Sequence, residues 1–238
     1  MYLSSLLTVS EQATNVVKWI SVGGVFLTLV LIALIGLLRN KRLDAKKVAF
    51  AGVCVAMSFT LAIIKVKPVE SGGSITLASF VPILIFAYAY GVVDGLLIGL
   101  IHGLLNFIES PYILSPATFI FDYLLAFMSV GAMGFFGKMK RKQKGCIPVV
   151  LGCLVVFTLR FLSHFFSGMI FFANEAIWVS FPDWALANPF IYSFIYQCIY
   201  IPADSLIAIM ALIVICKTGV LDKLVQKARL NEKTSQPQ

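Results

Sequence analysis

The chain has 238 residues, of which 60% are hydrophobic and only 13% are charged, and its mean hydropathy is +0.94. A water-exposed surface needs roughly 25 to 35% charged residues, so this composition excludes a soluble protein and indicates one whose main solvent is the lipid bilayer. The net charge of +8 does not indicate a nucleic-acid partner, because the basic residues lie in short groups between apolar runs. That placement is typical of cytoplasmic loops of a membrane protein.

A helix that crosses a bilayer needs about 20 mainly apolar residues. The first candidate run lacks a basic start and ends in Arg39, Lys41 and Arg42, which favours a retained span over a cleaved signal peptide. The fourth run is short, so it would tilt little, be shielded by its neighbours, or extend through the turn at Asp94. We therefore predict an all-α integral membrane protein with seven spans. The seven runs are Val17 to Leu38, Val48 to Val66, Thr76 to Val92, Gly95 to Ile108, Ser115 to Gly137, Ile147 to Phe172 and Phe190 to Cys216.

The basic residues predict the orientation of these spans. Three groups of five Lys and Arg residues, within 39–47, within 138–144 and from Lys217 onward, contain 15 of the 19. These groups fall on one side if the spans alternate, and the positive-inside rule makes that side cytoplasmic. The N-terminus is then outside. We expect an extra span with a basic loop (1–46), a six-helix substrate-binding domain (47–216) and a basic cytoplasmic tail (217–238).

Small residues form two helix faces along the predicted spans. A face of this kind lets another backbone approach closely. The glycine face on the fourth run predicts helix packing within this chain. The face on the second run begins beside a basic loop and indicates docking of a partner helix. The two faces are Gly91, Gly95, Gly99 and Gly103, and Ala45, Ala49, Gly52 and Ala56.

Ionisable residues inside a membrane are costly and usually face a cavity or a partner. Asp122 lies in the fifth run, and Arg160 and His164 lie one helical turn apart on the sixth, with Gly168 one turn further. The predicted topology brings His164 and Gly168 to the same depth as Tyr192 on the seventh run. This suggests a polar pocket that opens to the outside. The alternatives are an ion pair between Asp122 and Arg160 and a satisfied core histidine at His164.

Other polar residues of the spans have plainer interpretations. Gln197 lies in the outer half of the seventh run, while His102 and Asp204 are expected to be structural. The outer loops carry aromatic residues such as Tyr112 and Phe172, which suit the wall of a pocket for a ring-shaped ligand. Trp178 and Trp184, also in an outer loop, could instead belong to an interfacial aromatic belt.

The sequence offers no catalytic or metal-binding pattern. It contains no phosphate-binding GxxxxGK[ST] loop, no HExxH and no CxxC, and its five cysteines lie mostly within apolar runs. We expect neither an enzyme nor a cofactor or metal site. A membrane-embedded enzyme that uses Asp122 and His164 as acid and base stays open as an alternative, as does a purely structural subunit.

Five short motifs in order resemble the thiamine-specific S component of energy-coupling factor transporters, over about Lys47 to Cys216. They are GGSITL (72–77) followed by VPIL (81–84), YGVVDG (90–95), YILS (112–115), FDYLLA (121–126) and RFLSHFFSG (160–168). The resemblance implies a six-helix subunit of the plasma membrane that captures a vitamin, most plausibly thiamine, from outside. A transmembrane coupling subunit and two cytoplasmic ATPases would complete the importer, with docking on the face of Ala45, Ala49, Gly52 and Ala56. The loop Lys67 to Ser74 would gate the pocket.

The resemblance also implies a set of substrate-binding residues. Asp122 takes the place of the binding carboxylate, His164 and Phe172 would stack on a ring, and Tyr112 would close the site. Three departures from the pattern stand out. The chain has Asp122 where the family has Glu, Gln197 where it has Asn, and Phe172 and Gly73 where it has Trp, so another vitamin or precursor, such as hydroxymethylpyrimidine or a pyridoxine-type ring, stays open. The full set is Tyr112, Asp122, Tyr123, Arg160, His164, Gly168, Phe172, Tyr192 and Gln197.

Overall fold

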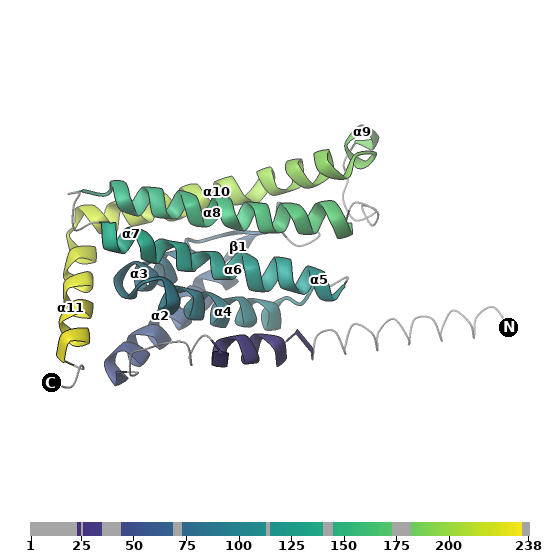
Figure 1. Cartoon of the computed structure of the whole chain (residues 1–238). Coiled ribbons are helices and arrows are strands. Elements are labelled where there is room, and N and C mark those ends of the chain that lie inside the picture. The colour runs from purple at the N-terminus through teal and green to yellow at the C-terminus, as the bar shows by residue number, and fades with distance from the viewer. Residues whose placement is uncertain are drawn as a thin grey trace.

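The computed structural model describes residues 23–24, 26–34, 44–68, 73–112, 115–139, 145–172 and 182–234, and these are mainly helical (Figure 1). Residues 23–24 and 26–34 are helical and belong to the first predicted span. The elements that follow are α2 (Ala45–Ile63), β1 (Lys65–Val66), β2 (Ile75–Thr76), α3 (Phe80–Tyr90), α4 (Val92–Glu109), α5 (Pro116–Phe119), η1 (Ile120–Leu125), α6 (Ala126–Met128), η2 (Ser129–Ala132), α7 (Met133–Met139), α8 (Ile147–Ser167), η3 (Gly168–Phe172), α9 (Asp183–Leu186), α10 (Pro189–Lys217) and α11 (Val220–Thr234).

Within the described ranges, five helical segments are long and apolar enough to cross a membrane. They correspond to the second, fourth, fifth, sixth and seventh predicted runs. The fourth is longer than its apolar core, because α4 extends through Asp94 to Val92 and reaches 18 residues. The segments are Ala45–Ile63, Val92–Glu109, Pro116–Gly137, Ile147–Ile170 and Pro189–Lys217.

The third run differs from the prediction of one long helix. Thr76 pairs with Lys65 in a small antiparallel β-hairpin, and α3 covers only 11 residues. At 1.5 Å per residue such a helix rises about 16 Å, roughly half of a hydrocarbon core. All residues of α3 from Phe80 to Tyr88 are buried in the protein. Its apolar sequence therefore reflects burial among other helices, which an apolar run alone does not distinguish from exposure to lipid.

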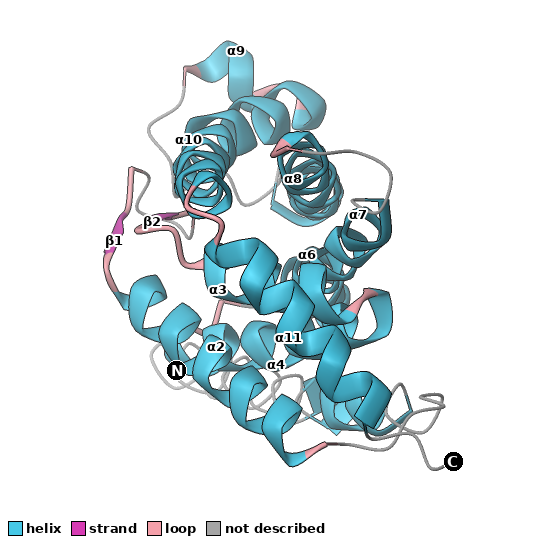
Figure 2. Ribbon diagram, turned by 90° about the vertical axis from the view of Figure 1, so that its left-hand side faces the viewer, coloured by secondary structure: helices cyan, strands magenta, loops and turns pink. Residues whose placement is uncertain are grey.

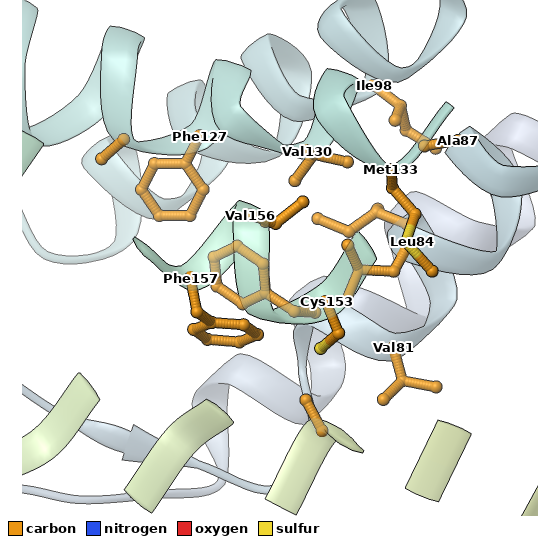
Figure 3. Packing of buried hydrophobic residues seen from close by; sticks show 14 of the residues in the cluster. Val81, Leu84, Ala87, Ile98, Phe127, Val130, Met133, Cys153, Val156 and Phe157 are labelled. Carbon is orange, nitrogen blue, oxygen red and sulfur yellow. The ribbon is translucent and has the colours of Figure 1, made fainter. Parts of the chain in front are cut away.

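A glycine turn places α3 against α4. Gly91 has φ of 101°, a conformation that favours glycine, and its N–H donates to the carbonyl of Ala87 at 2.8 Å. In the view from the α11 end, α3 lies among the longer helices (Figure 2). The side chains of α3 meet those of α4, α6, α7 and α8 in the core (Figure 3). The labelled core residues are Val81, Leu84, Ala87, Ile98, Phe127, Val130, Met133, Cys153, Val156 and Phe157.

The glycine face of α4 packs within the chain, as predicted. A Cβ at Gly95 would lie 2.9 Å from the Cα of Gly131, and one at Gly103 would lie 2.6 Å from the carbonyl oxygen of Tyr123. These glycines let α4 approach the fifth span closely. Gly91 also lies against the fifth span, because a Cβ at Gly134 would come within 2.3 Å of the carbonyl carbon of Gly91. A Cβ at Gly91 itself would meet nothing within 4 Å, so glycine is required there by the turn and not by this contact.

Two predicted loop regions hold more structure than the sequence suggested. Lys47, counted with a basic loop, is 5% exposed and pairs with Asp94 on α4 at 2.5 Å. The basic tail forms α11, which lies across the end of the bundle (Figures 1 and 2). Its buried residues Leu221, Val225 and Ala228 recur at helical spacing and face the bundle. At the opposite end, a Cβ at Gly24 would touch the ring of Phe119, so the first helical stretch packs beside α5.

Candidate functional site

A cavity of about 130 Å³ lies in the half of the bundle away from α11 and opens to solvent at its mouth. Of the nine predicted site residues, eight line it, and the side chain of Phe172 lies outside the described part of the chain. The polar residues that the sequence singled out on the fifth, sixth and seventh runs therefore line one cavity. The lining residues are Gly73, Ser74, Thr76, Ser79, Phe80, His102, Asn106, Tyr112, Asp122, Tyr123, Phe127, Arg160, His164, Gly168, Tyr192, Tyr196, Gln197 and Tyr200.

A carboxylate and an imidazole meet in the wall of this cavity. Asp122 lies in η1, a π-helical turn of the kind that often occurs at functional sites. Its carboxylate accepts a hydrogen bond from Ser167 Oγ at 2.8 Å and lies 2.9 Å from Nδ1 of His164. Their side chains are only 17% and 14% exposed. The pair joins the fifth and sixth spans.

Only one of the two ring nitrogens of His164 has a hydrogen-bond partner among the described residues. Nδ1 faces the carboxylate of Asp122, which assigns the ring proton of neutral His164 to Nδ1. Nε2 is buried and has no hydrogen-bond partner among the described residues. The alternative of a fully satisfied core histidine at His164 is therefore not what the described residues show. The hydrogen-bonding capacity of this nitrogen is unused among the described residues.

Arg160 pairs with a different carboxylate from the one considered first. Its Nη1 donates to Asp204 on α10 at 2.7 Å, and its guanidinium lies 4.4 Å from the ring centre of Phe80. An ion pair between Arg160 and Asp122 is therefore not what the structure shows. Asp204 is 2% exposed and also accepts from Thr76, at 3.0 Å from its backbone N and 2.7 Å from its Oγ1.

The end of the predicted gate, the loop Lys67 to Ser74, also contacts α10 through Gly73. The backbone N–H of Gly73 donates to the hydroxyl of Tyr196 at 2.9 Å, and a Cβ at Gly73 would lie 2.5 Å from the ring of Tyr200. Tyr200 donates in turn to the side-chain oxygen of Gln197. Residues 69–72 of the predicted gate lie outside the described residues.

Tyr123 and Gly168 line the cavity and also hold the segments around it in place. The hydroxyl of Tyr123 donates to the carbonyl of Ser110 at 3.1 Å and accepts from the N–H of Tyr112 at 3.1 Å, which fixes the turn after α4. A Cβ at Gly168 would lie 3.1 Å from Cβ of Ser193. This glycine therefore allows the close approach of η3 to α10.

Several lining residues were missed by sequence reasoning. Tyr196 and Tyr200 follow Tyr192 at four-residue spacing, so a helical projection of the seventh run would have found them. His102 was expected to be structural, yet it lines the cavity, and so does Asn106 one turn away. Thr76 and Ser79 had no sequence signal, because the hairpin that carries Thr76 was hidden inside an apolar run.

Two further predictions concern other regions. Within the described part of the chain, no group of three or more His, Cys, Asp or Glu side chains could hold a metal ion. On α2, the small-residue face is exposed, and a Cβ at Gly52 would meet nothing within 4 Å. The residues of this face are Ala45, Ala49, Gly52 and Ala56.

Comparison with known proteins gives three matches. The family model described as thiamine transporter protein (Thia_YuaJ) matches residues 48–223. The thiamine transporter ThiT of Bacillus subtilis (strain 168) is 29% identical over 156 residues, which cover 62% of this chain and 77% of that protein. A solved structure of ThiT from Listeria monocytogenes has a TM-score of 0.64 at 22% identity, covers 75% of this chain and 96% of that chain, and shows the same fold.

Proposed function

The chain belongs to the thiamine transporter protein family (Thia_YuaJ), and on that premise we propose that it is the high-affinity thiamine-capture subunit of an energy-coupling factor importer. Membership of this family identifies the chain as a multi-pass membrane transport protein rather than an enzyme. The substrate-binding role of the cavity residues and the partner subunits belong to the proposal.

The observation that carries the proposal is the pair of Asp122 and His164 in an aromatic-walled cavity. Thiamine joins an aminopyrimidine to a positively charged thiazolium ring. The carboxylate of Asp122 can accept from the pyrimidine amino group, and its negative charge favours a cation nearby. Nε2 of His164 is free to accept, and Tyr112 and Tyr192 supply aromatic faces suited to a cationic ring.

The proposed topology follows from the basic loops and has seven spans. The N-terminus lies outside, and the first span is additional to a six-helix membrane domain at 47–216. The end of the bundle with α11 then faces the cytoplasm, and the cavity opens outward. Capture from outside requires this orientation. The described helical residues 23–24 and 26–34 support the first span.

The exposed face of α2 supports the proposed docking of a transmembrane coupling subunit. Small residues let a partner helix approach closely, and packing drives helix association within lipid. Gly52 lies at the middle of this face with open space around it. Two cytoplasmic ATPases would complete the importer, since this chain has no phosphate-binding loop.

A ligand screen tests the substrate. Purified protein in detergent is titrated with thiamine, hydroxymethylpyrimidine and pyridoxine, and binding is followed by tryptophan fluorescence and by calorimetry. We expect thiamine to bind at submicromolar concentration and to bind most tightly. If thiamine at high micromolar concentration gives neither quenching nor heat, the proposed substrate is wrong. Tighter binding of another ring would identify a different vitamin.

Two substitutions test the site. Asp122→Asn and His164→Ala should each weaken thiamine binding at least tenfold, about 1.4 kcal/mol, with an unchanged gel-filtration profile. Asp183→Asn is the matched control, because Asp183 is an exposed carboxylate of α9 outside the cavity lining. Unchanged affinity in both cavity variants would place the site elsewhere.

A further inference from the structure

The base of the small hairpin connects two helices that both line the cavity. Lys65 of β1 and Thr76 of β2 are partners across its two strands. On one side, Nζ of Lys65 donates to both carboxylate oxygens of Glu109 at the end of α4, at 2.9 and 2.7 Å. On the other side, Thr76 donates to the carboxylate of Asp204 on α10. One pair of facing residues therefore attaches the hairpin to α4 and to α10.

The two attachments differ in how deeply they are buried. Asp204 is 2% exposed and also accepts from Nη1 of Arg160 at 2.7 Å. The side chains of Lys65 and Glu109 are 15% and 27% exposed, so water and salt ions reach this pair and weaken it. The attachment to α4 is therefore the one that separates more easily.

The hairpin has little support from apolar packing. Val66 of β1 is 68% exposed, and Leu77, which follows β2, is 53% exposed. Segments with few buried apolar contacts open locally at a low cost in free energy. A single ion pair can therefore decide whether the hairpin rests against α4.

The ion pair lies beside the cavity. Thr76, which faces Lys65 across the hairpin, lines the cavity, and so does Asn106, which lies three residues before Glu109 on the same face of α4. Neither Lys65 nor Glu109 belongs to the lining itself. Separation of the pair would therefore open the cavity between the hairpin and α4.

The segment that follows Glu109 has its own attachment. The hydroxyl of Tyr123 donates to the carbonyl of Ser110 and accepts from the N–H of Tyr112, both at 3.1 Å. These bonds do not depend on Lys65, so Tyr112 keeps its place when Lys65 leaves Glu109. Loss of the ion pair therefore changes access to the cavity and leaves its lining in place.

We propose that Lys65 and Glu109 form the latch of the cavity: the ligand enters and leaves between the hairpin and α4 when this ion pair separates, while Thr76 stays attached to Asp204. The inference rests on the proposed function, which supplies thiamine as the ligand. The latch closes the free and the bound protein alike, because neither of its side chains belongs to the cavity lining. It therefore slows entry and exit by the same factor and leaves the affinity unchanged.

Stopped-flow fluorescence of the full chain with thiamine tests the latch. Lys65→Met and Glu109→Gln should each raise kon and koff about fivefold, with Kd unchanged. The reversed pair, Lys65→Glu with Glu109→Lys, should return both rates toward those of the wild type. Lys46→Met is the matched control and should change neither rate, because Lys46 is an exposed lysine at the end of α2 away from Lys65.

The two single variants also separate a latch from electrostatic attraction of the ligand. Lys65→Met removes a positive charge and Glu109→Gln removes a negative one, so attraction of a cation would change kon in opposite directions. Release of a latch raises kon in both variants.

A second measurement follows the opening of the cavity without a ligand. The cavity-lining residue Asn106 is replaced in Asn106→Cys, and a small water-soluble thiol reagent is added. Modification of this position is followed by peptide mass spectrometry, which separates it from the natural cysteines. Addition of Lys65→Met should make the modification about fivefold faster.

The outcomes separate this inference from the proposed function. Weaker binding with an unchanged kon would show that the pair shapes the binding site, and unchanged kon and koff would show that the ligand passes elsewhere; either result overturns the latch. If thiamine does not bind the folded wild type, the proposed function fails, and the thiol reagent then decides alone: equal modification with and without Lys65→Met overturns the latch. Thermal unfolding of each variant confirms that changes in rate are not losses of fold.

Discussion

Asp204 provides the sharpest test of the network that joins the cavity to the hairpin. Its carboxylate receives three donors: Nη1 of Arg160 at 2.7 Å, and the N and Oγ1 of Thr76 at 3.0 and 2.7 Å. Asp204→Asn removes the negative charge but keeps an oxygen that can accept from Thr76. The charge of Arg160, whose side chain is 9% exposed, is then left without its counter-ion.

Breaking a buried ion pair from one side costs about 3 to 5 kcal/mol. The ring of Phe80 below the guanidinium offsets part of this, by about 1 to 2 kcal/mol. The expected net loss is therefore about 1 to 4 kcal/mol of unfolding free energy. For a chain of this size, each kcal/mol shifts Tm by about 2 to 4 °C. The Tm in detergent should therefore fall by roughly 2 to 16 °C.

The double variant Arg160→Met with Asp204→Asn is the control. It removes both charges and keeps an acceptor for Thr76, so it should recover most of the lost stability, because pairs of this kind are often replaceable by uncharged groups. Additive losses in the two single variants and the double variant would refute the reasoning, since they would show that Arg160 and Asp204 do not depend on each other. A loss below 1 kcal/mol in Asp204→Asn would refute it as well.

The remaining predictions concern glycines. Gly103→Leu should destabilise the fold by about 1 to 3 kcal/mol, because a Cβ at Gly103 would already lie 2.6 Å from the carbonyl oxygen of Tyr123. Gly52→Leu should leave thermal stability and thiamine affinity unchanged but reduce co-purification with the coupling subunit. Equal stability losses in both would contradict the assignment of the two faces. Gly73→Val should accelerate thiamine dissociation, measured by stopped-flow fluorescence. The new side chain would push the ring of Tyr200 away and break the hydrogen bond from the backbone N–H of residue 73 to the hydroxyl of Tyr196. An unchanged dissociation rate would show that this segment does not retain the ligand.

The positions of five spans, and several polar residues that line the cavity, followed from the sequence because each had a direct physical signal. Apolar length located five of the spans, since bilayer thickness fixes that length. Charged residues inside those runs located Asp122, Arg160 and His164, since charges within lipid are costly unless they serve a cavity or a pair. The glycine face of α4 was correctly read as internal packing, because Gly95 and Gly103 touch the fifth span.

Pairing partners did not follow from the sequence. Arg160 could reach a carboxylate on either neighbouring element, and only helix rotation decides between Asp122 and Asp204. The short α3 was hidden for a related reason, because burial in protein and exposure to lipid select the same apolar residues. His102 was taken as structural because one histidine on a glycine-rich helix carries no sign of which way it faces.

One ion pair and one hydrogen-bonded pair place the proposed ligand contact and the attachment of the hairpin on one face of α8. Arg160 and His164 are a single turn apart on α8; the first holds Asp204 and thereby Thr76 of β2, while the second holds Asp122 in the cavity wall. If the ligand binds at His164 and Asp122 as proposed, we predict that binding and attachment of the hairpin are coupled through α8. Such a coupling is reciprocal, so a substitution that loosens Thr76 from Asp204 should lower the affinity for the ligand.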